Sequence, residues 1–321
     1  MTARIAVVGA SGWAGSRHVA GFADAGARIA ALIDPSPRTA ALAEVHGARV
    51  LPDVAELSQD QVDLVVVALP SSMQPAVCRT LLEAGYRVLV EKPLAPGLAA
   101  TEALADVPGI EERLMVGFTL RGHPAVPALR KWIAQERPVG VSIRSVARKR
   151  VVEDWRADPA EGGVLVVNGV HALDLALHLL GTDARVHAVD SGSRLYGAGV
   201  ADYVATTVDL GGTLVRLETY WSPWELDEGL NAGDWDLTVD LVAPHGRRVW
   251  RNATLRAWER DRPSVVTSLG EHELFRVQAD AALAFAGGAP APAGFQDALA
   301  VARLVDAIAD AGRAEPKEGA A

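Results

Sequence analysis

The sequence predicts an α/β protein of two domains: a doubly wound parallel sheet, then an α+β domain built on an open, mainly antiparallel sheet. In residues 1–119, short β-branched runs alternate with longer segments of helical spacing, which is typical of a parallel sheet with helices on both faces. In residues 120–321, strand-like runs follow one another with glycine turns between them, as in antiparallel sheets. The length of 321 residues also exceeds what one ordinary core supports.

The N-terminal domain, residues 1–119, is expected to alternate strands and helices. The expected strands are Ile5–Val8, Arg28–Ile33, Asp63–Ala68, Arg87–Val90 and Leu114–Phe118, and the expected helices are Arg17–Ala25, Arg38–Val45, Pro75–Ala84 and Leu98–Ala105. Gly26, Gly47 and Gly85 each follow a helical run, where a left-handed C-cap is favoured. These glycines therefore mark the ends of three crossover helices.

The C-terminal domain, residues 120–321, is expected to mix four helices with six strands. The helices are Pro124–Gln135, Val164–Leu180, His272–Phe285 and Gln296–Ala311, and the strands are Gly140–Ala147, Arg185–Tyr196, Asp202–Leu210, Thr213–Trp221, Trp235–Ala243 and Arg247–Trp250. Gly211-Gly212 and His245-Gly246 lie where hairpin turns belong. The pattern leaves open whether the last two helices pack back on the first domain.

Composition excludes several classes of protein. A formal net charge of -9 argues against nucleic acid or an anionic membrane as the main partner. No run reaches the roughly 20 apolar residues of a membrane span, and the strand expected at Ile5–Val8 leaves no room for a signal peptide before it. Cys78 is the only cysteine, so a disulfide scaffold is excluded. We expect a cytoplasmic protein with a small-molecule substrate.

A glycine-rich turn, Gly9-Ala10-Ser11-Gly12-Trp13-Ala14-Gly15, follows the first strand and opens the first helix. Such a turn presents amide N–H groups at a helix N-terminus to a dinucleotide pyrophosphate. The motif fits a GxGxxG/A register, with Ser11 and Ala14 in place of two glycines, and a GxxGxxG register equally well. The candidate cofactor contacts in this turn are Gly9, Ser11, Gly12, Trp13 and Ala14.

Asp34 ends the second strand, about 20 residues after the glycines, where an acid holds the adenosine ribose hydroxyls. A carboxylate there repels a 2′-phosphate, which favours NAD over NADP. The alternative is that Asp34-Pro35-Ser36 forms only a turn and helix cap. Arg38 lies close enough to affect the preference, so the expected cofactor is NAD or NADP, with NAD favoured.

Glu91-Lys92-Pro93 follows the strand Arg87–Val90, at the sheet edge where α/β folds bind ligands. Lys92 is one of only four lysines in the sequence. Reduction of a carbonyl needs a proton donor for the developing alkoxide, and a lysine ammonium provides one. The alternative is a surface ion pair.

The expected helix Val164–Leu180 is apolar except for one stripe of polar residues: Asn168, His171, Asp174 and His178. Their spacing of three or four residues places them on one face. A polar stripe on a buried helix normally faces a cleft, and a histidine there exchanges protons near neutral pH. The alternatives are a satisfied core histidine, a surface stripe, or a metal site, for which no further ligand cluster is evident.

Together these motifs resemble the Gfo/Idh/MocA oxidoreductase family. The resemblance rests on the glycine turn, Leu69-Pro70-Ser71-Ser72, Glu91-Lys92-Pro93, Gly117-Phe118 with Arg121 and His123-Pro124, and Gly162-Gly163 through Gly169-x-His171-x-x-Asp174, in this order over nearly the whole chain. It implies a Rossmann domain for NAD or NADP, and a second domain whose open sheet often mediates oligomers. A homodimer or homotetramer through that sheet is therefore expected.

The resemblance also implies roles for individual residues. Lys92 matches the lysine that contacts the nicotinamide and the reacting oxygen, and His171 matches the catalytic histidine. Asp174 matches a carboxylate that contacts substrate. The remaining candidates are Pro70, Ser71 and Glu91 beside the cofactor, and Asn168, Trp155 and Arg121 beside the substrate.

Three positions depart from the family pattern: Ser11 replaces a glycine, Gln74 a common histidine, and Val167 an aspartate that often completes the acid–base group one turn before His171. Loss of a general base typically costs roughly 10²–10⁴-fold in rate. Either His171 works alone with Lys92, or another acid takes over, or the chemistry differs from alcohol oxidation.

Three functions follow. The first is NAD(P)-dependent hydride transfer to or from a sugar-like or other small carbonyl or hydroxyl substrate. The second keeps the cofactor but changes the reaction to imine reduction or redox-neutral chemistry, which the loss of a carboxylate at Val167 favours. The third is a non-catalytic sensor that binds a dinucleotide. All require a nicotinamide seated between the Glu-Lys-Pro turn and the helix that bears His171.

Overall fold

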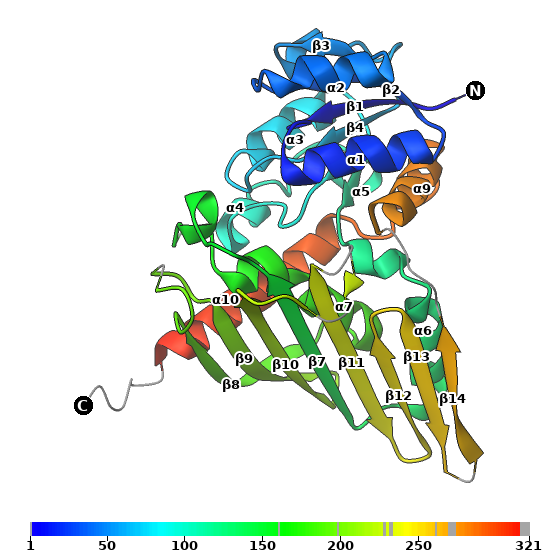
Figure 1. The fold of residues 1–321 in the computed structure, drawn as a ribbon, viewed down its shortest axis with the longest axis vertical. Helices are drawn as coiled ribbons and strands as arrows, with labels where there is room; N and C mark the ends of the chain where they lie inside the picture. Colours follow the sequence, from blue (N-terminus) through cyan, green and yellow to red (C-terminus); the bar gives the residue numbers. More distant parts are fainter. Residues whose placement is uncertain are drawn as a thin grey trace. The chain divides into compact units, whose positions relative to one another are not determined.

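The computed structural model describes residues 2–159, 161–197, 199–226, 229–230, 234–260, 262–268 and 274–314 (Figure 1). The chain divides into two compact units. The first consists of Met1–Gly122 with Glu273–Leu299, and the second of His123–His272 with Ala300–Ala321. The first unit therefore takes in a segment from near the end of the sequence.

Within the described part of the first unit, a six-stranded parallel sheet has the order β3-β2-β1-β4-β5-β6. Its strands are β1 (Arg4–Val8), β2 (Arg28–Ile33), β3 (Arg49–Leu51), β4 (Leu64–Val67), β5 (Val88–Val90) and β6 (Leu114–Val116). The strand order reverses between β1 and β4, and dinucleotide-binding sheets hold their ligand at such a switch point. The expected doubly wound parallel sheet is confirmed. The three-residue strand β3 was not predicted, because it is too short to show a period.

Helices of both chain segments cover this sheet. They are α1 (Trp13–Asp24), α2 (Arg38–His46), α3 (Gln74–Glu83), α4 (Leu98–Glu102), α5 (Ile110–Arg113) and α9 (Leu274–Ala286). Phe22 of α1 and Phe285 of α9 lie in one buried cluster with strand residues such as Leu32. A Cβ on Gly21 would lie 2.9 Å from the carbonyl oxygen of Phe275, so α1 and α9 pack closely. Residues 272 and 273, which the expected helix His272–Phe285 included, lie outside the described residues.

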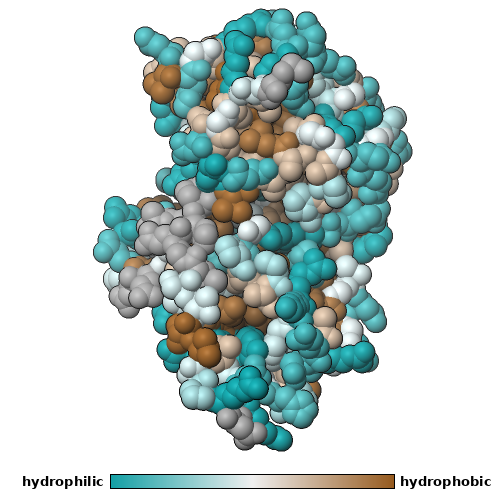
Figure 2. Space-filling model, turned by 90° about the vertical axis from the view of Figure 1, so that its right-hand side faces the viewer, coloured by the Kyte–Doolittle hydropathy of each residue, from teal (hydrophilic) through white to brown (hydrophobic). Residues whose placement is uncertain are grey.

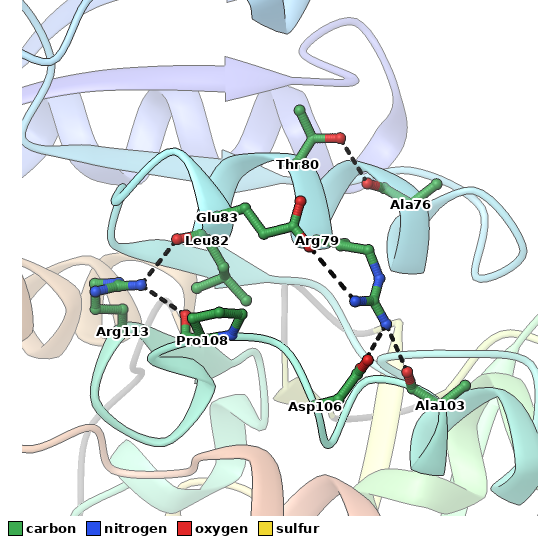
Figure 3. A network of polar contacts seen from close by, with 9 residues as sticks. All are labelled: Ala76, Arg79, Thr80, Leu82, Glu83, Ala103, Asp106, Pro108 and Arg113. Carbon is green, nitrogen blue, oxygen red and sulfur yellow. Dashed lines mark hydrogen bonds and ion pairs between the residues drawn. The ribbon is translucent and has the colours of Figure 1, made fainter.

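Two arginines attach α3 to the chain that follows α4 (Figure 3). Arg79 pairs with Glu83 on its own helix and with Asp106, 2.7 Å away, and donates to the carbonyl of Ala103. Arg113 donates to the carbonyls of Leu82 and Pro108. These contacts fasten neighbouring segments of the first unit together.

In the second unit, the described residues form an eight-stranded sheet of order β14-β13-β12-β11-β7-β10-β9-β8. The strands are β7 (Gly140–Arg148), β8 (Ala184–Gly192), β9 (Tyr203–Leu210), β10 (Thr213–Ser222), β11 (Trp235–Ala243), β12 (Gly246–Arg251), β13 (Thr254–Glu259) and β14 (Arg262–Ser268). Only the pair β7–β10 is parallel, so the expected mainly antiparallel sheet is confirmed. β13 and β14 were not predicted. The hairpin between β9 and β10 turns at Gly211 and Gly212, both with positive φ.

Helices α6 (Ala125–Glu136) and α7 (Val170–Leu180) pack on this sheet. The last helix, α10 (Phe295–Ala314), begins in the first unit and continues into the second. Side chains on the helix-covered face of the sheet are buried, among them Ile143 of β7 and Leu217 of β10. Their strand neighbours Ser142 and Arg216 are exposed. The second face of the sheet is therefore polar.

Hydrophilic residues predominate on the face shown in Figure 2, where hydrophobic residues form separate small patches. Large exposed apolar side chains lie on different elements, for example Val45 at the end of α2 and Val265 in β14. Among the helices that the structure describes, none combines the length and the apolar character needed to cross a membrane.

Candidate functional site

The glycine turn lies between β1 and α1 and is shaped by close backbone contacts. Gly9 has a φ of +77°, and a Cβ there would lie 2.2 Å from the carbonyl oxygen of Ala68. A Cβ on Gly15 would lie 2.0 Å from the carbonyl oxygen of Gly9, whereas one on Gly12 would lie 3.3 Å from that same atom. Only glycine fits at Gly9 and Gly15, so the turn follows the GxxGxxG register.

The N-terminus of α1 is open to an anion. Its N-cap is Gly12, which has no side chain to cap the first amides, and the first turn contains no acidic residue. Trp13 and Ala14 begin the helix, and the Trp13 ring is about half exposed with the Arg17 guanidinium 4.0 Å from its centre. Uncapped amides, the helix dipole and a nearby cation suit a pyrophosphate. The residues present therefore fit a dinucleotide.

Asp34 connects the glycine turn to the end of β2. Its Oδ2 accepts the amide N–H of Ser11 at 2.9 Å, and its Oδ1 accepts that of Ser36 at 2.8 Å. The Ser11 hydroxyl bonds Thr39, and the Arg38 guanidinium donates to the Ser11 carbonyl at 3.3 Å. Asp34 thus stabilises a turn, as in the alternative interpretation from sequence. Each of its carboxylate oxygens can still accept another hydrogen bond, so ribose binding remains compatible with this turn.

Lys92 follows β5 at the carboxyl edge of the same sheet, in a turn held by buried side chains. The Lys92–Pro93 peptide bond is cis. Gln74, the first residue of α3 and 1% exposed, donates to the carbonyls of Glu91 at 3.0 Å and Pro93 at 2.6 Å. Gln74, which departs from the family pattern, therefore fixes the backbone on both sides of Lys92. Pro70 and Ser71 form the turn between β4 and α3, where the Pro70 carbonyl accepts the amide N–H of Met73.

Glu91 is paired with His18 of α1. His18 Nε2 and Glu91 Oε1 are 2.7 Å apart, and the histidine side chain is fully buried. Glu91 Oε2 accepts the amide N–H of Lys92 at 3.2 Å. Burial opposes ionisation of Glu91, but the hydrogen bond from His18 and the neighbouring positive charges hold the pKa of Glu91 below its ordinary value. A carboxylate is therefore present inside the first unit, directly beside the Lys92 backbone.

Arg121, expected beside the substrate, forms an ion pair with Asp297 at 2.8 Å and donates to the carbonyl of Pro292. Its side chain is 5% exposed. These contacts join the Thr119–Gly122 turn to the first turn of α10 and to the segment just before it, so within the first unit Arg121 has a structural role.

The helix expected over Val164–Leu180 is not a single α-helix. Leu165–Gly169 form a π-helical turn, and the α-helix α7 begins at Val170. The Val170 amide N–H bonds the carbonyl of Leu165, five residues earlier. A π-turn has a wider residue spacing than an α-helix and recurs at functional sites. Val167 therefore does not follow the spacing of the expected unbroken α-helix, and its side chain is buried.

Two polar residues of this segment, Asn168 and His171, contact aromatic side chains of the sheet. Asn168 Oδ1 accepts the Trp221 indole N–H at 2.7 Å. The His171 ring lies 4.9 Å from the Trp235 ring, and the Trp235 N–H donates to Ser145 Oγ at 2.8 Å. Asp174 is fully buried and His171 is 8% exposed. The aromatic contact fixes the imidazole plane within the second unit.

Trp155 lies in the 3₁₀ turn Asp154–Ala157, and the Arg156 guanidinium stacks 4.5 Å from its ring centre. In this region Arg144 pairs with Asp236 and stacks on Tyr220, and Arg148 pairs with Glu225. The structure thus gives protein partners to these basic residues. Among the described residues, no group of three or more His, Cys, Asp or Glu is arranged to hold a metal ion.

Sequence reasoning missed three residues of the site: His18, Gln74 as a clamp, and Trp235 as the neighbour of His171. His18 carried a signal, because a histidine three residues after Gly15 lies on the buried side of α1. Gln74 and Trp235 make their contacts with residues distant in the sequence, so the sequence held no signal for their roles.

Comparisons with known proteins agree with this arrangement. A family model described as "Oxidoreductase family, NAD-binding Rossmann fold" matches residues 3–118, and the "GFO/IDH/MocA C-terminal domain" matches residues 134–230. Inositol 2-dehydrogenase 2 of Paenarthrobacter aurescens is 30% identical over 332 aligned positions, which cover 96% of this chain and 95% of that protein.

Solved structures show the same fold. Levoglucosan dehydrogenase in complex with NADH has a TM-score of 0.80 at 18% identity, covering 98% of this chain and 97% of that one. UDP-N-acetylglucosamine 3-dehydrogenase from Acidithiobacillus ferrooxidans has a TM-score of 0.79 at 22% identity, covering 97% and 98%.

The sheet, its glycine turn and these similarities define an oxidoreductase with a Rossmann domain for NAD or NADP. The chain belongs to the Gfo/Idh/MocA family of NAD(P)-dependent dehydrogenases and reductases.

Proposed function

We propose that this protein transfers a hydride between NAD(P) and a small polyhydroxylated, sugar-like substrate, interconverting an alcohol and a ketone. The observation that carries the proposal is the position of Lys92. It lies just after β5 and Glu91, at the carboxyl edge of the sheet whose β1 leads into the glycine turn and the uncapped N-terminus of α1. That edge is where such sheets bind dinucleotides. Sugar-related relatives, including an inositol 2-dehydrogenase and a D-xylose 1-dehydrogenase, support the substrate class.

Each candidate residue has a defined task in this reaction. Bound nicotinamide accepts or supplies the hydride. The Lys92 ammonium donates a hydrogen bond to the substrate oxygen and stabilises its developing negative charge. His171 takes the hydroxyl proton in oxidation and returns it in reduction. Asp174 binds a second substrate hydroxyl, and the Asn168 amide N–H₂, with Oδ1 occupied by Trp221, donates to another.

The cofactor contacts follow from the geometry of the first unit. The amides at the start of α1 bind the pyrophosphate, while Pro70, Ser71 and Glu91 border the nicotinamide half. Asp34 uses its remaining acceptor positions for the adenosine ribose, which favours NAD over NADP. Trp155 and the end of the Thr119–Gly122 turn, which carries Arg121, border the substrate.

We further propose that two or four copies associate through the polar face of the eight-stranded sheet. This face alternates charges of both signs: the Arg144–Asp236 and Arg247–Asp240 pairs lie within one sheet and suit contact with a second copy. Light scattering at several concentrations tests the association, and a monomer at every concentration overturns it.

We place the protein in the cytoplasm, because its only cysteine, Cys78, is a buried free thiol.

The experiment that tests the main proposal is a substrate panel of inositol, xylose, levoglucosan and a nucleotide sugar with NAD and NADP. We expect reduction of the cofactor with at least one polyol or sugar, and its loss in Lys92→Met. Cofactor binding without turnover of any polyol, sugar or matching ketone contradicts the proposal.

A second function is favoured by Val167, an apolar, buried residue at the position where the family resemblance implies an aspartate. This second proposal is imine reduction, or a redox-neutral step in which the hydride returns to the substrate, because neither needs that carboxylate as a base for alcohol oxidation. In the redox-neutral case, bound NAD is unchanged after many turnovers and product forms without added oxidant. Net conversion of the cofactor in step with alcohol oxidation excludes it.

A further inference from the structure

The turn that carries Lys92 is anchored from inside the first unit by a buried pair, His18 and Glu91. His18 comes from the middle of α1, and Glu91 is 73 residues later in the sequence, at the end of β5. The histidine side chain is fully buried, and the glutamate side chain is 10% exposed. A buried charge is costly unless it is paired and hydrogen-bonded. The free-energy cost of burying this pair must therefore be offset by further hydrogen bonds.

The second oxygen of Glu91 makes such a hydrogen bond. While His18 Nε2 holds Oε1 at 2.7 Å, Oε2 accepts the Lys92 amide N–H at 3.2 Å. The carboxylate thus connects the rigid helix α1 to the amide of Lys92. If His18 were replaced by a residue without an N–H donor, Oε1 would have to seek another partner, and rotation of the carboxylate would release the Lys92 amide.

The His18 ring is itself held in place. It meets the Phe275 ring edge to face, with centres 4.9 Å apart, and lies 6.4 Å from the Phe22 ring. Because α1 also begins at the glycine turn, the same helix that presents its N-terminal amides fixes the Lys92 turn. Two parts of the expected cofactor site therefore share one rigid support.

We propose that His18 is a positioning residue for Lys92, acting through Glu91 to fix the backbone from which the Lys92 side chain extends. This inference rests on the proposed role of Lys92 in hydride transfer. A displacement of about 1 Å at a catalytic group costs on the order of 10²-fold in rate. Loss of the His18 contact therefore lowers kcat and leaves cofactor binding by the glycine turn intact.

The test compares two substitutions that separate hydrogen bonding from packing. His18→Phe keeps an aromatic ring against Phe275 but has no donor, whereas His18→Gln keeps an N–H donor near the place of Nε2. We expect kcat to fall by about 10- to 100-fold in His18→Phe and to be largely restored in His18→Gln. The Kd for NAD(H) changes less than about twofold in both. His46→Phe, at the end of α2, is the matched histidine control and keeps full activity.

Hydrogen exchange of the Lys92 amide gives a readout that does not depend on turnover. Protection of this amide should fall in His18→Phe, return in His18→Gln and stay unchanged in His46→Phe. Equal protection and equal kcat in all variants overturn the proposal. If the wild type shows no turnover at all, the proposed function fails, while the exchange experiment still decides whether His18 holds Lys92.

A second substitution serves as a control for misfolding. If His18→Phe gives no folded protein, His18→Met supplies a flexible apolar side chain of similar length that still lacks a donor. Loss of the folded state in both variants, or a fall in kcat that His18→Gln does not restore, assigns the pair to stability alone and overturns the positioning role.

Discussion

The carboxylate of Asp34 accepts the amide N–H of Ser11 at 2.9 Å, so the end of β2 and the glycine turn are joined by one side chain. The same carboxylate accepts the Ser36 amide N–H at 2.8 Å. A residue expected from sequence to bind the cofactor ribose therefore also shapes the turn that receives the pyrophosphate. Cofactor preference and turn geometry cannot be changed independently at this position.

Replacement of Asp34 tests the cofactor preference. In Asp34→Ala we expect affinity for NAD to fall by about tenfold or more, because charge-assisted hydrogen bonds are each worth roughly 1.5–3 kcal/mol. The ratio of the NADP Kd to the NAD Kd should fall, since a negative charge near the 2′-phosphate is removed. Arg38→Ala should raise that ratio. Titration of each cofactor by fluorescence measures the ratio, and a value unaltered in both variants refutes the assignment.

The two glycines that face the Gly9 carbonyl should respond differently to alanine. Gly15→Ala places a Cβ 2.0 Å from that oxygen, so the helix must shift; overpacking of this kind costs about 1–3 kcal/mol. Gly12 has an ordinary φ of -69°, and a Cβ there would lie 3.3 Å from the Gly9 carbonyl oxygen. Gly12→Ala should therefore fold normally, but its methyl group should obstruct the approach of a pyrophosphate. Urea denaturation and NAD titration together separate the two effects. Equal loss of stability in both variants would contradict the closer backbone contact at Gly15.

Arg121 should matter for stability. In Arg121→Ala, Asp297 loses its ion-pair partner but still accepts the Gly294 amide N–H, and the Pro292 carbonyl loses a donor, with an expected cost of about 1–2 kcal/mol. Arg79→Ala, which removes exposed ion pairs on α3, is the control and should change stability little. Thermal denaturation measures both. Unchanged stability in Arg121→Ala would contradict this structural role, whatever the effect on the KM for substrate.

Glu91 should give the protein part of its pH dependence. Its folded-state pKa lies below the ordinary value, so ionised Glu91 stabilises the fold above the ordinary carboxyl range, and this stability is lost as pH falls through the folded-state pKa. Glu91→Gln should be less stable than the wild type at neutral pH, and the difference should shrink on acidification. Urea midpoints over a pH series measure it. A difference that grows toward acid pH is incompatible with a lowered pKa.

The fold could be predicted because its main strands and helices are long enough to show their period. Strands such as Ile5–Val8 and the glycines after the crossover helices determine the parallel sheet, and Gly211-Gly212 determines a hairpin. β3 is only three residues long, and β14 is exposed throughout, so neither shows alternation of buried and exposed residues.

The site was predictable only where chemistry is local in sequence. The glycine turn, Asp34 and Lys92 belong to short motifs. The π-turn before α7 changes the residue spacing around Val167, and the sequence carries no sign of it because the helical pattern runs on from Val164 to Leu180. The His18–Glu91 pair joins residues that only the folded β1-α1 and β5 units bring together. Arg121 was placed beside the substrate from its motif, and its contact with Asp297 could not be foreseen across such a separation.

The central claim is that this protein transfers a hydride directly between nicotinamide and substrate with Lys92 bound to the reacting oxygen. The most direct measurement supplies cofactor deuterated at the transferable position of its nicotinamide together with a ketone from the panel, and determines the label in the product by mass spectrometry. The account predicts a product that gains a single deuterium in the wild type, and no product in Lys92→Met although that variant still binds cofactor. Unlabelled product, or equal conversion by Lys92→Met, would contradict it.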